Sequence, residues 1–159
     1  YGPKNSANIY SFIESIYNKK YIQIGNGKNI KSIIYIDNLV SATIYSIKKL
    51  NKRLIRYNLV DEPSLNIKNL AKLVRAKCGI NKTNNNRFIP IYIAMPILYF
   101  YEFVSKLLNT KPFITVEKLR KFMSSTMIDG SLIRKKGYIQ KISTEQGINE
   151  TINWIKNNL

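Results

Sequence analysis

Apolar side chains recur every three or four residues in three well-separated stretches, the spacing that places them on one face of an α-helix. The stretches are residues 8–19, 64–79 and 143–159. Their expected buried positions are Ile9, Phe12, Ile13 and Ile16 in the first, Ile67, Leu70, Ala71, Val74 and Cys78 in the second, and Ile148, Ile152 and Ile155 in the third. The pattern predicts three amphipathic helices, each with one buried apolar face.

Further helices are expected where a residue that can cap a helix precedes an apolar run. Asp37 is predicted to cap a helix that buries Leu39, Val40, Thr43, Ile44, Ile47 and Leu50. Thr115 is predicted to cap one that carries Val116, Leu119 and Phe122, and Asp129 a short one that carries Leu132 and Ile133 and ends at Gly137. Ser64 and the capping-box spacing from Ser143 to Gln146 are expected to start two of the helices described above.

Three segments read as strands. Residues 21–24 and 31–36 flank Gly25-Asn26-Gly27, a turn sequence, and are predicted to pair as a hairpin. Residues 56–60 are expected to form a buried strand between two helices, and Phe88-Ile89 a brief extended piece. Strands alternating with helices predict an α/β fold with a layered sheet.

The longest uncharged stretch, residues 88–101, contains Pro90 and Pro96 and is shorter than the roughly 20 apolar residues that span a bilayer. We expect a buried or interfacial segment and no transmembrane helix. Pro96 is expected at a helix start or a kink, because proline lacks the N–H of a helix interior.

The net charge and the counts of histidine and cysteine limit the partners and reactions that this chain can support. The 159 residues, enough for one domain, carry 26 Lys and Arg against nine Asp and Glu, a net charge of +17 that favours anionic partners. The absence of histidine excludes imidazole bases and His-bound metals within this chain. Cys78, the single cysteine, is expected to be a buried structural thiol.

Three local signals are weaker than they first look. Gly25-Asn26-Gly27 lacks the third glycine of a dinucleotide-binding loop, because Ile30 occupies that position. Asp61 and Glu62 are adjacent, so they point to opposite sides of an extended chain and are expected to face solvent or the next helix start. The tyrosines lie mostly at core-like spacings and no nucleic-acid motif is present, so nucleic acid is not the expected partner.

Read in order, several short runs resemble one known family. They are Tyr1-Gly2-Pro3, the helix from Asn8, Gly25-Asn26-Gly27, the run from Lys31 to Val40, Tyr57-Asn58-Leu59, Lys136-Gly137-Tyr138 and Glu145-Gln146-Gly147. Their order is similar to that in the C-terminal half of NAD-dependent epimerases/dehydratases, the nucleotide-sugar branch of the extended short-chain dehydrogenases/reductases. The resemblance covers essentially the whole chain.

The resemblance implies a fold: the C-terminal portion of an extended Rossmann-type dehydrogenase, with a mostly helical substrate-binding lobe and a small hairpin. Residues 1–159 would be that part, and since the chain starts at Tyr1 we expect a piece of a longer protein. The cofactor-binding half, with its glycine-rich loop and Tyr-x-x-x-Lys pair, would lie outside this sequence and bind NAD or NADP. The resemblance further implies a nucleotide-sugar substrate, a cytoplasmic homodimer as the full-length protein, and no activity in this piece alone.

Three residues match positions where the family contacts the substrate. Asn8, at a helix start, matches an Asn whose amide or neighbouring N–H groups bind the diphosphate, as a helix N-terminus can. Lys31 stands where the family usually has an Arg. The lysine keeps the positive charge but lacks the planar guanidinium that can bind two oxygens at once. Arg87 is the expected counterpart of a late Arg that closes on the diphosphate. Asp37 and Asn38 match residues with a structural role, helix capping and backbone bonding, and no catalytic residue is expected here.

Two other functions stay open. A basic non-catalytic module for nucleic acid or an anionic membrane would also explain the net charge. A steroid or lipid-alcohol dehydrogenase of the same superfamily would suit the apolar stretch of residues 88–101.

Overall fold

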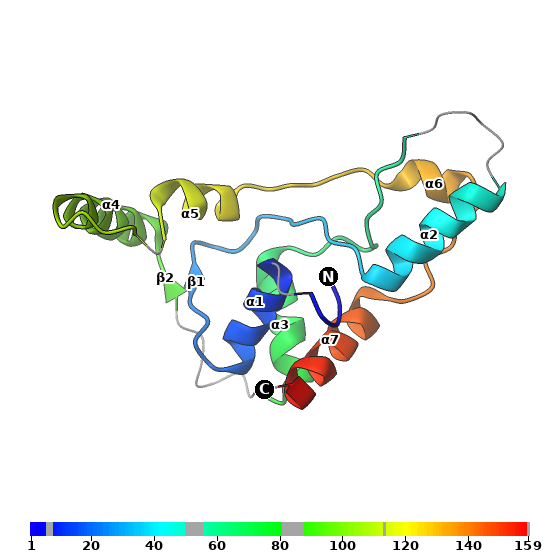
Figure 1. The fold of residues 1–159 in the computed structure, drawn as a ribbon, viewed down its shortest axis with the longest axis horizontal. Helices are drawn as coiled ribbons and strands as arrows, with labels where there is room; N and C mark the ends of the chain where they lie inside the picture. Colours follow the sequence, from blue (N-terminus) through cyan, green and yellow to red (C-terminus); the bar gives the residue numbers. More distant parts are fainter. Residues whose placement is uncertain (6–7, 50–55, 81–87, 113, 159) are drawn as a thin grey trace.

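The computed structural model describes residues 1–5, 8–49, 56–80, 88–112 and 114–158. Its elements follow in the order α1 (Asn8–Tyr17), β1 (Gln23–Ile24), α2 (Ile36–Lys49), α3 (Ile67–Lys77), β2 (Phe88–Ile89), α4 (Ile91–Leu107), α5 (Val116–Met123), α6 (Ser131–Lys135) and α7 (Thr144–Asn158). Figure 1 shows α4 and α5 at one end of the molecule, α2 and α6 at the other, and α1, α3 and α7 grouped between them. The described part is mostly helical.

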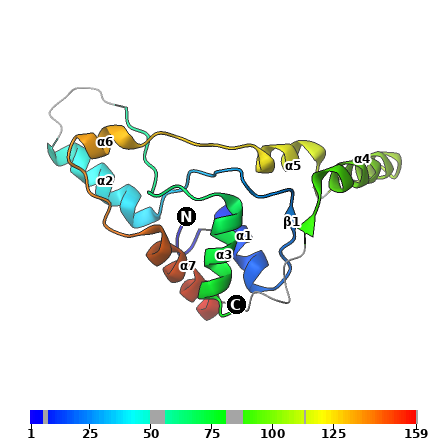
Figure 2. The same cartoon turned by 180° about the vertical axis from the view of Figure 1, so that it is seen from behind.

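The main core lies between α1, α3 and α7, which the view from behind in Figure 2 also shows packed together. It buries Phe12, Ile13 and Ile16 of α1, Ile67, Leu70, Ala71 and Val74 of α3, and Ile148, Ile152 and Ile155 of α7. These are the positions that helical spacing predicted, so the three-helix prediction is confirmed. Cys78 is only half-buried at the end of α3, where burial raises the pKa of its thiol.

The caps predicted for α5 and α7 are present, and the cap predicted for α3 is not. The Ser143 Oγ accepts from the backbone N–H of Gln146 at 3.2 Å while Gln146 Oε1 accepts from that of Ser143 at 2.9 Å, a reciprocal capping box as predicted. The Thr115 side chain accepts from the Lys118 N–H, as predicted for α5. The predicted cap Ser64 is wrong, because Asn66 supplies the oxygen that accepts from the Asn69 N–H at 2.8 Å.

The predicted hairpin is also wrong. β1 pairs in parallel with β2, Gln23 opposite Phe88 and Ile24 opposite Ile89, and Lys31–Ile36 forms no strand. Gly25 and Gly27, with φ of +68° and +64°, turn the chain toward α3, where the Lys68 N–H donates to the Gly27 carbonyl at 3.0 Å. Residues 30–32 then run beside residues 125–128.

Residues 56–60 are extended but form no strand in the part of the chain that the structure describes. The next residue, Asp61, donates its N–H to the Ile33 carbonyl at 2.9 Å, a single backbone contact with the segment before α2. A strand needs a continuous ladder with a neighbour, and one bond does not make one. The predicted strand is therefore an isolated extended segment here.

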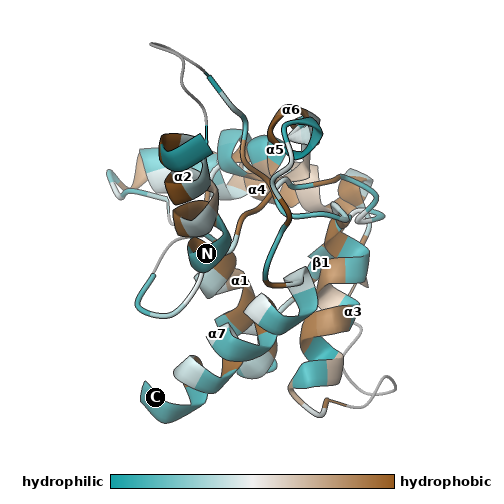
Figure 3. Ribbon diagram, turned by 90° about the vertical axis from the view of Figure 1, so that its right-hand side faces the viewer, coloured by the Kyte–Doolittle hydropathy of each residue, from teal (hydrophilic) through white to brown (hydrophobic). Residues whose placement is uncertain are grey.

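The buried face predicted for α2 is wrong. Asn38 and Ala42 are its buried residues, and Leu50 lies outside the described residues. Four apolar side chains that spacing assigned to the core are exposed. They are Leu39 (36% exposed), Val40 (48%), Ile44 (47%) and Ile47 (76%). The helix also starts at Ile36, so Asp37 lies in its first turn and does not cap it. Figure 3, which looks onto this end of the molecule, shows the hydrophobic bands along α2.

A second, smaller core joins α4 to α5 through Ala94, Leu98, Val116 and Leu119. Pro96 lies inside α4, away from its start. Much of the remaining apolar surface of α4 is exposed, including Tyr92, Phe100, Phe103 and Leu107. Burial was one of two expectations for this stretch, and it is wrong for most of the helix.

Candidate functional site

A buried carboxylate, Asp61, joins the chain's first residues to α2. Asp61 is 2% exposed. Its Oδ2 accepts from the Tyr35 backbone N–H at 2.8 Å and from the Tyr1 hydroxyl at 3.5 Å, and its Oδ1 accepts from the Asn38 amide at 2.8 Å. The expectation that Asp61 faces solvent is wrong, since three donors converge on it. We call Tyr1, Tyr35, Asn38 and Asp61 the Asp61 cluster.

Asn38 extends this cluster to the segment before α7. Its amide donates to the Ile142 carbonyl at 2.7 Å, and its Oδ1 accepts from the Ile142 N–H at 3.0 Å. The role of Asn38 is structural, as predicted: its buried side chain bonds the backbone of Ile142, 104 residues away.

The two phenols of the cluster stay protonated near neutral pH. Desolvation by burial raises the pKa of the Asp61 carboxyl, against the hydrogen bonds that lower it. Burial also raises the pKa of Tyr1, and burial with the hydrogen bond to Glu150 raises that of Tyr35, both far above neutrality. Two neutral phenols beside a carboxyl bind and orient; they supply no base.

The cluster positions the Tyr1-Gly2-Pro3 loop against residues 34–36. The Tyr1 nitrogen donates to the Ile34 carbonyl at 2.8 Å, and the Ile36 N–H donates to the Tyr1 carbonyl at 2.9 Å. A side chain at Gly2 would meet Ile36 Cγ2 at 2.7 Å, so only glycine fits this approach.

Asn8 is the first residue of α1 and is exposed. The first backbone N–H groups of a helix have no partner within it, and the helix dipole adds positive potential there. Residues 6–7 lie outside the described residues. The structure places Asn8 where an anion can reach it.

Lys31 lies in the seam between residues 30–32 and 125–128, a register that sequence alone did not reveal. Its Nζ donates to the Lys121 carbonyl at 2.9 Å, and partial burial lowers the pKa of the ammonium. Two backbone hydrogen bonds fix the seam. The Ser32 N–H donates to the Thr126 carbonyl at 3.1 Å, and the Thr126 N–H donates to the Ile30 carbonyl at 2.9 Å. Lys31 is therefore a positioned cation.

The structure does not join Asn8 directly to Lys31, two of the three predicted site residues. No hydrogen bond links Asn8 to Lys31 among the residues that the structure describes, and Arg87 lies outside them. A small pocket that the sequence did not indicate lies beside Asp61, between α2 and α6; Ile34, Asn38, Asp61, Arg134, Tyr138 and Gln140 are among its lining residues. The one signal for it was the Lys136-Gly137-Tyr138 run, since the Tyr138 hydroxyl donates to the Asn38 carbonyl at 3.0 Å.

Within the described residues, no group of three His, Cys, Asp or Glu side chains could hold a metal ion. Across those same residues, no helix combines the length and apolar character needed to cross a bilayer.

Comparison with known proteins identifies the fold. No family model matches the chain. The chain is 26% identical over 147 residues to a sterol-4-alpha-carboxylate 3-dehydrogenase (decarboxylating) from Dictyostelium discoideum, covering 90% of this chain and 44% of that protein. It is 27% identical over 154 residues to N-acetyl-alpha-D-glucosaminyl-diphospho-ditrans,octacis-undecaprenol 4-epimerase from Escherichia coli O157:H7, covering 97% of this chain and 46% of that protein. The chain thus spans about half the length of these relatives.

Solved structures agree at the level of the fold. A GDP-mannoheptose C4 reductase from Campylobacter jejuni with NADP bound superposes with a TM-score of 0.64 at 18% identity, over 98% of this chain and 46% of that one. A UDP-glucuronic acid 4-epimerase from Bacillus cereus in complex with NAD gives 0.63 at 16% identity, over 99% and 42%.

The fold is that of the C-terminal portion of an extended Rossmann-type dehydrogenase, as predicted apart from the hairpin. Within that class, the resemblance to the NAD-dependent epimerases/dehydratases is confirmed by both kinds of comparison.

Proposed function

We propose that this chain is the substrate-binding lobe of an NAD(P)-dependent enzyme that epimerises, dehydrates or reduces a sugar attached to a diphosphate, with a nucleotide on the far side of the diphosphate. The observation that carries the proposal is the likeness over 97% of the chain to an epimerase whose name gives a sugar-diphosphate substrate. The other named enzymes with this fold include ones for GDP- and UDP-sugars.

The diphosphate would be held by positive groups of this chain. Exposed N–H groups at the start of α1, beside Asn8, would donate to phosphate oxygens, and Lys31 would supply a cation at the seam. Arg87 would close on the same diphosphate. Because partial burial lowers the Lys31 pKa, a bound anion would relieve the cost of keeping that ammonium charged.

The cofactor would be held by the half of the enzyme that relatives carry outside the matched region. NAD or NADP held there would supply hydride transfer at a sugar carbon. The exposed apolar side of α2, with Val40, Ile44 and Ile47, would pack against that half, which removes their area from water. This chain would supply binding and orientation, and the whole enzyme is proposed to act as a homodimer in the cytoplasm.

A steroid or lipid alcohol is the second candidate substrate. The likeness to a sterol dehydrogenase and the exposed apolar surface of α4 favour it. Incubating the whole protein with NAD(P) and either UDP-sugars or 3-hydroxysterols, while following reduced-nicotinamide absorbance and products, separates the two. Turnover of sterols alone would overturn the sugar proposal.

Replacing Lys31 with methionine tests the diphosphate site. We expect Lys31→Met to weaken UDP binding to the whole protein about tenfold, because one charge-assisted contact is worth about 1.5 kcal/mol, and Lys31→Arg to restore most of it. Isothermal titration calorimetry measures both. Lys28→Met, which removes an exposed lysine from the neighbouring turn, is the matched control. Equal UDP affinity for the Lys31→Met and Lys28→Met variants would refute the role of Lys31.

A further inference from the structure

The outward side of α4 is an apolar strip. Tyr92, Pro96, Phe100, Phe103 and Leu107 follow one another at steps of three or four residues, so they share one side of the helix. Tyr92 and Leu107 are 74% exposed, Phe100 69% and Phe103 64%. The opposite side of α4 carries Ala94, Leu98 and Ser105, its buried residues. We call the five exposed residues the α4 strip.

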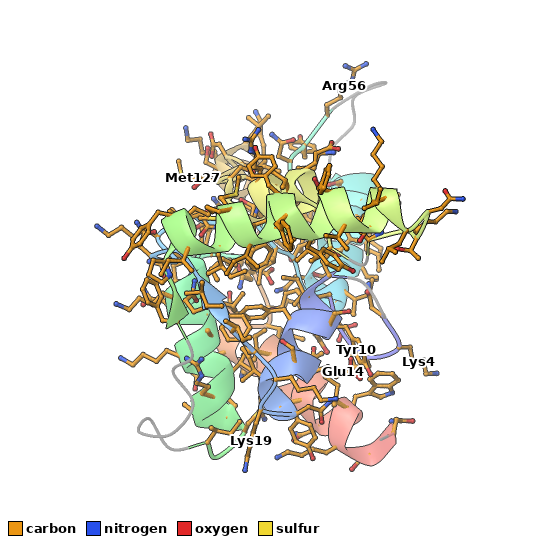
Figure 4. The ribbon with its side chains drawn as sticks, turned by 90° about the vertical axis from the view of Figure 1, so that its left-hand side faces the viewer. Lys4, Tyr10, Glu14, Lys19, Arg56 and Met127 are labelled. Carbon is orange, nitrogen blue, oxygen red and sulfur yellow. The ribbon has the colours of Figure 1, made fainter. Side chains whose placement is uncertain are left out.

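No other element of the described chain covers the strip. α5 is the element that packs against α4, and it contacts the buried side through Val116 and Leu119. Figure 4 looks onto this end of the molecule, where α4 lies in front of the other elements and runs across the view. A contiguous exposed apolar surface of this kind marks an interaction site.

The segment of α4 and α5 is basic, and we call Lys106, on α4, and Arg120, beside Tyr99, the basic border of the strip. Residues 91–127 hold five basic side chains, all exposed (Lys106, Lys111, Lys118, Arg120 and Lys121), and two acidic ones (Glu102 and Glu117). Both acids are engaged: Glu102 accepts from the Val116 N–H at 2.7 Å, and Glu117 pairs with Lys121 at 2.7 Å. Arg120 donates to the Tyr99 hydroxyl at 2.7 Å, which holds a guanidinium beside α4.

An aromatic apolar strip with a basic border matches the chemistry of an anionic lipid surface. Tyr side chains settle at the headgroup level, Phe and Leu side chains bury at the acyl boundary, and a lysine or arginine near an anionic leaflet is attracted to it. The 17 residues of α4 are about 25 Å long, enough to lie in the interface and too few to span the bilayer. A second copy would bring an equally basic border against this one, so like charges disfavour it.

We propose that the α4 strip docks on the surface of a bilayer that contains anionic lipid, with the helix lying in the plane of the membrane and its basic border over the headgroups. The strip shares no residue with the sites of Asn8 and Lys31, and this docking does not depend on the proposed function.

Vesicle co-sedimentation of the whole protein tests this docking. We expect the wild type to bind vesicles of phosphatidylglycerol and phosphatidylcholine, and Phe100→Ser/Phe103→Ser to bind at least about tenfold more weakly, since the variant no longer buries two apolar rings in the membrane. Ile139→Ser is the control, because it removes an exposed apolar side chain (81%) outside this surface. Urea unfolding of each variant confirms that exposed substitutions leave the fold intact.

Any of the following results would overturn the proposal. One is wild type that stays in the supernatant with both anionic and neutral vesicles. Another is an equal loss of binding in the α4 and Ile139 variants. So is binding that is unchanged in the α4 variant and abolished by about 1 M salt, because the net charge alone would then account for it. The last is a dimer in size-exclusion chromatography that the α4 variant dissociates while the wild type ignores vesicles, which would assign the strip to a second copy.

Discussion

We expect the Asp61→Ala substitution to lower the free energy of unfolding by about 3 kcal/mol, because it leaves buried donors without an acceptor. The Tyr35 N–H and one hydrogen of the Asn38 amide both lose their partner at 2.8 Å. Urea denaturation followed by circular dichroism measures the change. Glu62→Ala is the matched control, since this neighbouring carboxylate is exposed and its pair with Arg134 lies at the surface, where such a pair contributes less than about 1 kcal/mol. Equal losses in the two variants would contradict the buried role of Asp61.

The same carboxyl predicts a pH dependence. Burial raises its pKa in the folded state above the ordinary 3.8, so the native protein binds this proton more tightly than the unfolded chain does. Wild-type stability relative to Asp61→Asn should therefore increase as the pH falls through the raised pKa, and the increase should be complete below 3.8. A wild-type advantage that shrinks as the pH falls over this range would mean that the hydrogen bonds outweigh desolvation.

Replacing Gly147 with alanine should destabilise the protein by about 2 kcal/mol. A Cβ there would lie 2.8 Å from the Tyr35 ring and 2.8 Å from the Tyr1 hydroxyl, so buried rings must move. Overpacking of this kind costs roughly 1–3 kcal/mol and outweighs the better helix propensity of alanine, about 1 kcal/mol. Thermal unfolding monitored by circular dichroism measures the difference.

Asn153→Ala in the same helix is the control for Gly147. Asn153 is exposed, so its change reports helix propensity without packing. An increase in stability for both variants would show that α7 does not lie as close to Tyr35 as the structure has it.

The sequence predicted the helices well where a helix contacts others of this chain. The apolar positions of α1, α3 and α7 face one another, so periodicity and burial agree, and Ser143 and Gln146 cap α7 through contacts within four residues. Local rules suffice for such features because the partners are close in sequence or lie along one face.

Prediction failed where the partner is distant or outside the chain. Ile44 and Ile47 have the spacing of a core face, yet nothing among the described residues buries them. Residues 31–36 have the sequence of a strand, but the bridge partner of Lys31 is Thr126. A local sequence pattern cannot reveal a partner so distant along the chain. Asp61 looked solvent-facing because its donors, Tyr1 and Asn38, are far from it in sequence.

The sequence likewise indicated one part of the candidate site and missed another. Resemblance selected Asn8 and Lys31, and the structure gives each a local basis, a helix start and a seam, while leaving their shared ligand a proposal. The buried polar cluster that orders the neighbouring loop required the three-dimensional contacts. The net charge had indicated an anionic partner. We now propose two such partners, a diphosphate at Asn8 and Lys31 and an anionic membrane at the basic border of α4.

The most direct test of the central proposal is a turnover assay of the whole protein loaded with NAD or NADP. On addition of UDP-N-acetylglucosamine, or the same sugar linked through diphosphate to a polyprenol, we expect a new sugar product by NMR, with a lasting change in reduced-nicotinamide absorbance only where the net reaction reduces or oxidises the sugar. The two sugars distinguish a nucleotide from a lipid on the far side of the diphosphate. No absorbance change and no product with any nucleotide- or polyprenol-linked sugar would contradict the assignment of this chain to a sugar-diphosphate enzyme.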